Sequence, residues 1–284
     1  LISSRNNDFD KSLYEKAVRG ETELFFFNSW LEELKTHNYL HNHTRMWFAS
    51  TWIFSLGLPW ELGAKLFFKY LYDGDAASNL LSWRWVAGLH SNGKRYLYSP
   101  ENLRKFSNKR FNVENIKFKD IVIEDQYKFI YKDDIYKQTN KKQSDYLILF
   151  ENDLHESSLR ETIESYKKAY LVILNNEDRK IKISSEVINF KKKLCLEFAS
   201  KFTNLELICS KQLLGKLNNV NQLDLIYPSI GENYDFIKRF KLIYEKTIIP
   251  IVREEDLFSW KFAKRGFFKF KENIPKINKF IKIK

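Results

Sequence analysis

The sequence predicts an α + α/β organisation, in which an all-helical region is followed by a parallel α/β domain. From residue 11 to residue 110, apolar residues recur at helical spacing and no strand pattern repeats. From Asp145 onward, short runs rich in leucine and β-branched residues alternate with helical segments. Continuous apolar strands that alternate with helices are typical of a parallel sheet covered on both faces, so we expect the second domain to be Rossmann-like.

The helical region divides at its turn residues. The run FFFNSWLEELKTH, at 25–37, carries apolar residues at helical spacing with charged residues opposite. The run LHNHTRMWFASTWIFSL, at 40–56, is mostly apolar and predicts one long, largely buried helix. Gly57 and Pro59 end that helix and open the next, at 60–72. The DGD sequence predicts a loop at 73–75, and a further helix is expected over 76–89.

We expect four segments along the chain: a helical region at 1–111, a linker at 112–144, an α/β domain at 145–262 and a basic tail at 263–284. The linker is polar, charged and irregular. The domain predicts strands at 145–150, 169–175, 205–210, 222–228 and 247–254. Between them, helices are expected at 157–169, 185–202 and 232–246. The domain has neither GxGxxG nor GxxxxGK[ST], so any ligand is expected at the carboxyl ends of its strands.

Charge is distributed unevenly over the 284 residues. The formal net charge is +12, and the stretch from Lys261 to Lys284 holds nine Lys or Arg residues against one Glu. Such a balance permits sequence-independent contact with DNA phosphates, although a lysine-rich solvated surface would look the same. In the DNA interpretation, four phenylalanines anchor the tail while lysines face outward: Phe267, Phe268, Phe270 and Phe280, with Lys276, Lys279, Lys282 and Lys284.

Several features bear on the cellular setting. Cys195 and Cys209 lie in apolar surroundings and outside any CxxC, which indicates reduced core thiols of a cytoplasmic protein. No apolar run reaches the roughly 18 residues that a membrane span needs. The chain opens at Leu1 without a methionine, so we expect a processed or trimmed piece. We leave the oligomeric state open.

The segment from His41 to Trp85 concentrates unusual polar and aromatic residues. It contains HNHTRM at 41–46, DGD at 73–75 and the dense pair of tryptophans in WRW at 83–85. Taken singly, each has an ordinary interpretation: DGD is a turn, Trp60 and Trp83 are core aromatics, and two histidines two residues apart do not share a helix face to bind a metal. We therefore assign no metal site.

Taken together, these motifs and their spacing resemble the FAD-binding domain of the DNA photolyase and cryptochrome family, over roughly residues 11–107. The resemblance implies an FAD site and a set of ligand residues for it: Asn42, Arg45, Asp73, Gly74, Asp75 and Asn79. It places Asn79 opposite flavin N5, as in photolyases. His43 stands where the family has Arg. The family domain begins with elements that are not found before Leu1, and the antenna pigment stays unassigned.

The resemblance also implies roles in electron transfer and DNA contact. Trp83 matches the tryptophan nearest the flavin and Trp60 the next one, while Asn7 stands at the position of the outermost tryptophan. Indole is readily oxidised, so Trp83, Trp60 and Asn79 are the expected catalytic residues. The expected DNA-binding residues are Asn42, His43 and Trp85.

Three functions remain open at this point. The first is a deoxyribodipyrimidine photo-lyase, a carbon–carbon lyase in which light drives electron transfer from reduced FAD to pyrimidine dimers in damaged DNA. The second is a cryptochrome-type blue-light photoreceptor without repair activity. The third is a degenerate interaction protein that has lost FAD.

Overall fold

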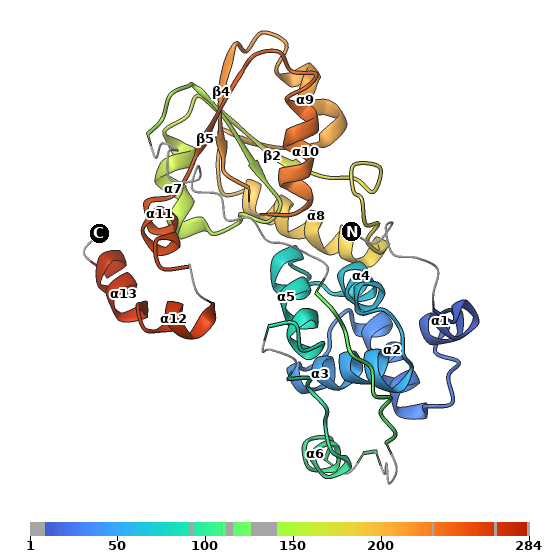
Figure 1. Cartoon of the computed structure of the whole chain (residues 1–284). Coiled ribbons are helices and arrows are strands. Elements are labelled where there is room, and N and C mark those ends of the chain that lie inside the picture. The colour runs from blue at the N-terminus through green and yellow to red at the C-terminus, as the bar shows by residue number, and fades with distance from the viewer. Residues whose placement is uncertain are drawn as a thin grey trace. The chain divides into compact units, whose positions relative to one another are not determined.

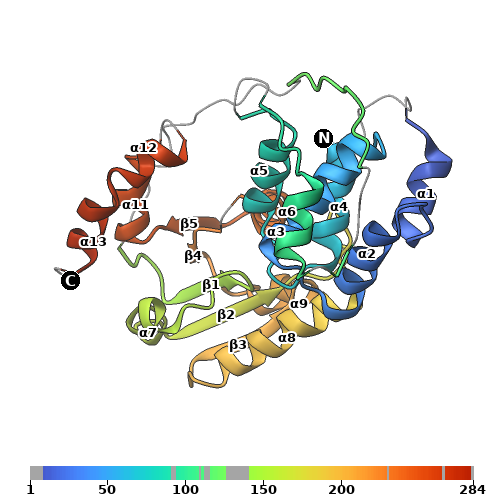
Figure 2. The same cartoon turned by 90° about the horizontal axis from the view of Figure 1, so that it is seen from below.

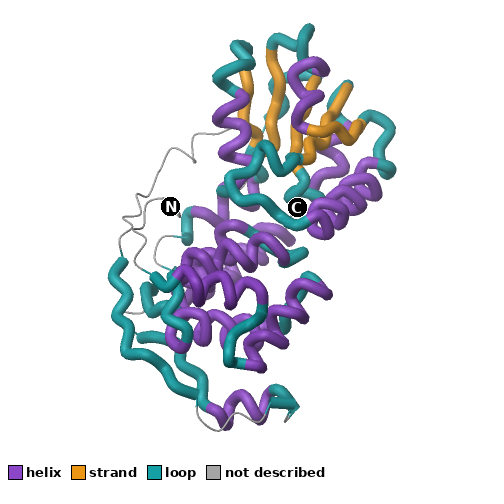
Figure 3. Tube along the Cα trace, turned by 90° about the vertical axis from the view of Figure 1, so that its right-hand side faces the viewer, coloured by secondary structure: helices purple, strands orange, loops and turns teal. Residues whose placement is uncertain are grey.

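The computed structural model describes residues 9–90, 94–108, 110–111, 116–125, 141–228, 230–263 and 266–282. The chain forms two compact units (Figure 1). Residues 1–128, 176–191 and 230–232 form the first, and the remaining residues form the second. In Figure 3 the described strands, in orange, all follow residue 145, and the earlier described residues are helices and loops, as the sequence predicts. Asn7 lies outside the described residues.

The helices of the first unit follow the apolar pattern closely. They are α1 (Lys11–Arg19), α2 (Phe25–His37), α3 (Asn42–Ser50), α4 (Trp60–Tyr70), α5 (Ala76–Val86) and α6 (Pro100–Phe106). The predicted helix at 40–56 is interrupted, because α3 gives way to a π-helical turn, η1 (Thr51–Ser55). Residues 47–54 are all buried on both sides of that junction. A π-helical turn holds more residues than an α-helical one, but in a run that is buried throughout it shifts no amphipathic pattern, so periodicity does not reveal it.

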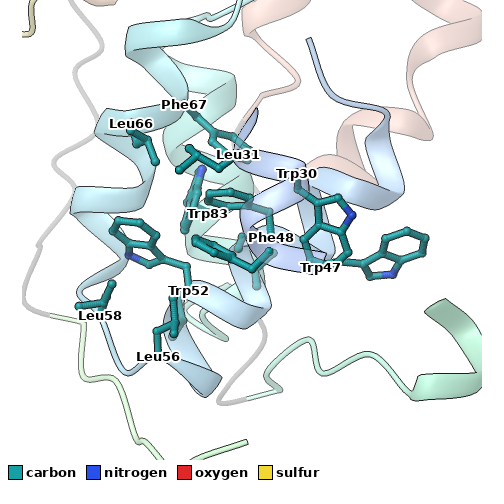
Figure 4. Packing of buried hydrophobic residues seen from close by; sticks show 14 of the residues in the cluster. Trp30, Leu31, Trp47, Phe48, Trp52, Leu56, Leu58, Leu66, Phe67 and Trp83 are labelled. Carbon is teal, nitrogen blue, oxygen red and sulfur yellow. The ribbon is translucent and has the colours of Figure 1, made fainter. Parts of the chain in front are cut away.

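The core of the first unit is aromatic (Figure 4). Trp83 is 2% exposed, and its ring lies edge-on to Phe67 at 5.0 Å, Phe48 at 6.4 Å and Trp52 at 6.5 Å between centroids. Gly63 of α4 supplies the space for this indole, because a Cβ at that position would lie 2.2 Å from Trp83 Cη2. The α4–α5 packing therefore depends on the absence of a side chain at residue 63.

Residues 116–125, from the predicted linker, have irregular backbone and contact the helical core. Lys119 N donates to Phe54 O at 2.6 Å, and Asp120 pairs with Arg95 at 2.9 Å. Asp125 accepts two hydrogen bonds from the buried guanidinium of Arg84, at 2.6 and 3.2 Å. This segment thus neutralises two arginines of the helical unit.

The second unit is a doubly wound α/β sheet of the predicted class. Its strands, β1 (Tyr146–Phe150), β2 (Lys168–Ile173), β3 (Leu205–Cys209), β4 (Gln222–Ile226) and β5 (Thr247–Ile251), are parallel in the order β3-β2-β1-β4-β5. One face packs against α7 (Glu156–Glu164) and α8 (Ser185–Ala199). The other packs against α9 (Ser210–Lys216), which the sequence pattern did not indicate, and α10 (Glu232–Phe240). Figure 2 shows α8 running beside β2 and β3.

After β5 the chain forms α11 (Glu254–Trp260), α12 (Phe267–Lys271) and α13 (Ile274–Lys282). The Phe280 ring stacks on Phe258 of α11 at 4.2 Å, as expected of an anchor. For Phe267 and Phe268 the anchor prediction is wrong, because these side chains are 66% and 79% exposed and contact each other. Gly266, with φ 80°, begins α12, and no side chain of that helix is buried, whereas α13 packs on α11.

Candidate flavin site

The expected ligand residues of the helical unit come from α3, the loop after α4 and the first turns of α5. The DGD loop lies between α4 and α5, where Asp75 caps α5 by accepting a hydrogen bond from Ser78 N at 2.7 Å. Glycine suits position 74 of this loop, because a Cβ there would make a tight contact of 3.1 Å with Leu71 O. Capping and close backbone approach explain why the loop uses aspartate and glycine at these positions.

An ion pair joins the two motifs that the sequence separates by 28 residues. Arg45 Nη2 donates to both carboxylate oxygens of Asp73, at 2.9 and 3.1 Å. Its Nε donates to Leu40 O at 2.8 Å, and its guanidinium lies 5.2 Å from the Tyr39 ring centroid. These contacts fix the arginine from three directions, and they hold a cation beside the DGD loop.

Asn79 lies one turn into α5 and is half-buried. Its Nδ2 donates to Ala64 O at 2.8 Å, which ties α5 to α4 and fixes the amide's orientation. Asn42 begins α3, is exposed, and so leaves its amide open to solvent. Asn42 and Arg45 thus lie on α3, and Asp73 lies in the loop that Arg45 contacts. Asp75 caps α5, and Asn79 lies within that helix.

His43 belongs to an aromatic stack. Its ring lies parallel to Phe106 at 4.6 Å and to His41 at 5.4 Å, and it tilts against Trp47 at 5.9 Å. The imidazole where the resembling family has arginine thus has a packing role. Over the described residues, no group of three His, Cys, Asp or Glu side chains could hold a metal ion.

The three expected tryptophans have different environments. Trp83 and Trp60 are each 2% exposed, whereas Trp85 is 41% exposed and packs on Tyr96 at 5.3 Å. The Arg84 guanidinium lies over the Trp60 ring, with its Cζ 5.9 Å from the centroid of that ring. Trp52 is the tryptophan in ring contact with Trp83, and it continues to Tyr14 at 6.0 Å. Spacing along the chain could not reveal this neighbour, because it depends on how η1 packs.

A segment from beyond the linker also contacts this part of the helical unit. Phe190 stacks on Tyr72, beside the DGD loop, at 4.3 Å. Ser184 N donates to Lys69 O at 2.9 Å, at the end of α4. Gly231 lies against Ala76 at the start of α5. No sequence signal of the helical region indicates these contacts, since the residues lie more than 100 positions away.

Comparison with known proteins supports the resemblance. A family model described as the FAD binding domain of DNA photolyase matches residues 3–113. A deoxyribodipyrimidine photo-lyase of Agrobacterium fabrum is 37% identical over 79 residues, which cover 28% of this chain and 16% of that protein. A cryptochrome DASH of Natronomonas pharaonis is 35% identical over 95 residues, covering 33% of this chain and 20% of the relative.

A deoxyribodipyrimidine photo-lyase of Buchnera aphidicola is 28% identical over an alignment of 126 positions, and the alignment covers 38% of this chain and 25% of the relative. The matched part of this chain thus spans at most a quarter of the length of these three relatives. No solved structure matches the chain. Among the helices within the described ranges, none is long and apolar enough to cross a membrane. Residues 3–113 of this chain therefore belong to the FAD-binding-domain family of the DNA photolyases and cryptochromes.

Proposed function

We propose that the helical unit binds FAD at the face formed by the start of α3, the DGD loop and the first turns of α5. The observation that carries the proposal is the Arg45–Asp73 ion pair, in which Arg45 Nη2 contacts both carboxylate oxygens and joins the two family motifs at one place. The donor set suits a flavin, because it combines an arginine, two carboxylates and two amides on partly exposed elements. The proposed ligand residues are Asn42, Arg45, Asp73, Gly74, Asp75 and Asn79.

Each residue has a distinct task toward the cofactor. Reduced FAD, when bound, supplies the light-driven electron that splits a pyrimidine dimer, a capacity that no side chain has. Arg45 provides a fixed positive charge that offsets a reduced, anionic ring. Asn79 presents its Oδ1, since its Nδ2 is held by Ala64 O. Trp83, 2% exposed, is the proposed electron donor to the flavin, because its indole is readily oxidised.

The proposed activity is that of a deoxyribodipyrimidine photo-lyase acting on damaged DNA. Trp85, exposed on α5, and the His43 stack offer aromatic surfaces to an extruded base, and Asn42 offers an amide beside them. The alternative is a cryptochrome-type photoreceptor without repair. The loss of the family's arginine at His43 favours that alternative, because a stacked imidazole is a weaker phosphate ligand than a guanidinium.

Retention of FAD tests the proposal. The full chain, expressed with excess FAD, should carry the visible flavin absorption band through gel filtration. Asp75→Asn keeps a capping side chain at α5 but removes the charge, so we expect the retained FAD to fall several-fold. The control is Asp10→Ala, which removes the cap of α1, where Asp10 accepts a hydrogen bond from Leu13 N at 2.9 Å, and should leave FAD unchanged. A chain that never retains flavin contradicts the proposal.

Repair activity separates the two flavin functions. The flavin-loaded chain, illuminated with blue light, should split the thymine dimers of an oligonucleotide into separate thymines. Trp85→Ala should lower dimer binding while FAD retention stays unchanged, because Trp85 is 41% exposed, packs on Tyr96 and is not among the proposed FAD ligands. Photoreduction of bound FAD without any dimer cleavage would favour the photoreceptor.

A further inference from the structure

A cavity opens at the carboxyl edge of the sheet in the second unit, between the ends of β1 and β4. The strand order reverses at this pair: from β1 the sheet continues to β2 on one side and to β4 on the other. The helices that follow β1 and β4, α7 and α10, pack on opposite faces. The loops after the two strands therefore separate, as at the ligand-binding crevice of open α/β sheets.

The cavity has a volume of about 150 Å³. It is lined by residues that follow three strands and by two further helices: Asn152, Asp153, Tyr227, Pro228, Asn233, Arg253, Asp256 and Trp260, with Phe150 and Ile226 at its base. A cavity of about this size holds a single six-membered ring. Tyr227 and Trp260 form an aromatic wall, with ring centroids 5.9 Å apart and an interplanar angle of 69°.

The cavity holds two carboxylates and one guanidinium, so its lining carries more negative than positive charge. Arg253 Nη1 donates to Asp153 at 3.2 Å and its Nε donates to Asp256 at 2.8 Å. One guanidinium is thus shared by two carboxylates, and each carboxylate keeps an oxygen that Arg253 does not bind in these two contacts. Burial raises the pKa of Asp153, while Arg253 and His155 oppose that rise and Asp256 adds to it. A carboxylate held in this way gains from a donor that enters the cavity.

Asn233 provides an independent indication of a ligand. The residue is 3% exposed and lines the cavity, and its Oδ1 accepts no hydrogen bond from any residue that the structure describes. A buried acceptor without a partner costs about 1–3 kcal/mol, and a donor that enters the cavity would remove that cost. Asp153, Asp256 and Asn233 thus each present an acceptor oxygen among the residues that line the cavity.

We propose that this cavity binds a small planar nitrogen compound through an edge of adjacent N–H groups, as in an amidine or a guanidine. The ring of such a compound fits against the wall that Tyr227 and Trp260 form, where an aromatic face favours a positive charge. The N–H edge satisfies Asp153, Asp256 and Asn233. Anions are excluded, because the one arginine of the site is already paired with two carboxylates. This inference is independent of flavin binding by the helical unit.

Calorimetric titration of the full chain with three isosteric probes tests the proposal. Benzamidine carries the N–H edge and the charge, benzamide carries one amide donor group without charge, and benzoate reverses the charge. We expect benzamidine to bind at least tenfold more tightly than benzamide, and benzoate to show no heat. Asp153→Asn and Asp256→Asn should each weaken benzamidine about tenfold, whereas Asp145→Asn, an exposed aspartate before β1, should have no effect.

The variant Asn233→Leu tests whether a loss of benzamidine binding could come from misfolding. Replacing an unpartnered buried amide with an apolar side chain should preserve or raise stability to urea while lowering benzamidine affinity several-fold. Benzoate binding as tightly as benzamidine would overturn the proposal. So would benzamidine binding that is unchanged in both aspartate variants, or an absence of benzamidine binding to the folded protein.

Discussion

Gly63→Ala should disrupt the helical unit through one contact. The added Cβ would meet Trp83 Cη2 at 2.2 Å and Cζ3 at 2.4 Å. Ordinary contact begins at 3.4 Å, so the indole has to shift by roughly 1.2 Å within a core where Phe48, Trp52 and Phe67 surround it. Such overpacking costs about 1–3 kcal/mol or more, and alanine returns up to about 1 kcal/mol through its helix propensity.

We therefore expect a net loss of about 2 kcal/mol in the free energy of unfolding of this unit. Urea titration followed by tryptophan fluorescence measures it, since six of the seven tryptophans belong to the helical unit. The matched control is Gly215→Ala in α9, where an added Cβ meets nothing within 4 Å. That change should be neutral or stabilising.

A second substitution checks that the clash is with the indole. Trp83→Phe shortens the ring that meets residue 63, so the double variant should lose less stability than the sum of the two single changes. If Gly63→Ala unfolds at the same urea concentration as the unmodified chain, the close packing of α4 on Trp83 is refuted, and with it the enclosed environment that we assign to this tryptophan.

Three further predictions concern the proposed functions. If ring contact governs electron supply to Trp83, Trp52→Phe should slow photoreduction of bound FAD several-fold, and by more than Trp60→Phe does. Flash absorption measures both rates, and equal effects of the two variants would refute the contact argument. Neutralising the exposed Lys276 and Lys279 should reduce the salt dependence of DNA affinity by up to about two logarithmic units of slope, and an unchanged slope would place DNA binding elsewhere. Benzamidine affinity should fall as pH is lowered, because protonation of Asp153 removes a carboxylate partner. Since burial raises the pKa of Asp153, this loss should begin at a higher pH than for an ordinary aspartate, and Asp153→Asn should remove that part of the pH dependence.

Sequence patterns predict the elements of this chain more reliably than their contacts. The run at 25–37 becomes α2 over those residues, and all five predicted strands form. The Arg45–Asp73 pair is different, because neither periodicity nor composition relates residues 28 positions apart. Only the resemblance of both motifs to one family places them at one site.

The sequence pattern also does not predict which individual side chains are exposed. Phe280 and Phe268 look alike in the sequence, yet one stacks on Phe258 and the other is exposed. The difference arises from how α13 packs on α11, a contact between helices that no local signal encodes. The cavity of the second unit is likewise assembled from loops that follow β1, β4 and β5, so its residues are far apart along the chain.

The junction of α3 and η1 has a consequence for how this protein can vary. Residues 47–54 are buried without interruption, so this stretch has no solvent-facing side on which substitutions are harmless. An ordinary amphipathic helix tolerates polar replacements at about every second or third position, and its tolerance rises and falls with the helical period. Here the tolerance should be uniformly low over eight consecutive positions. Change in this stretch is therefore confined to exchanges that conserve volume, or to paired substitutions in which a neighbouring helix compensates.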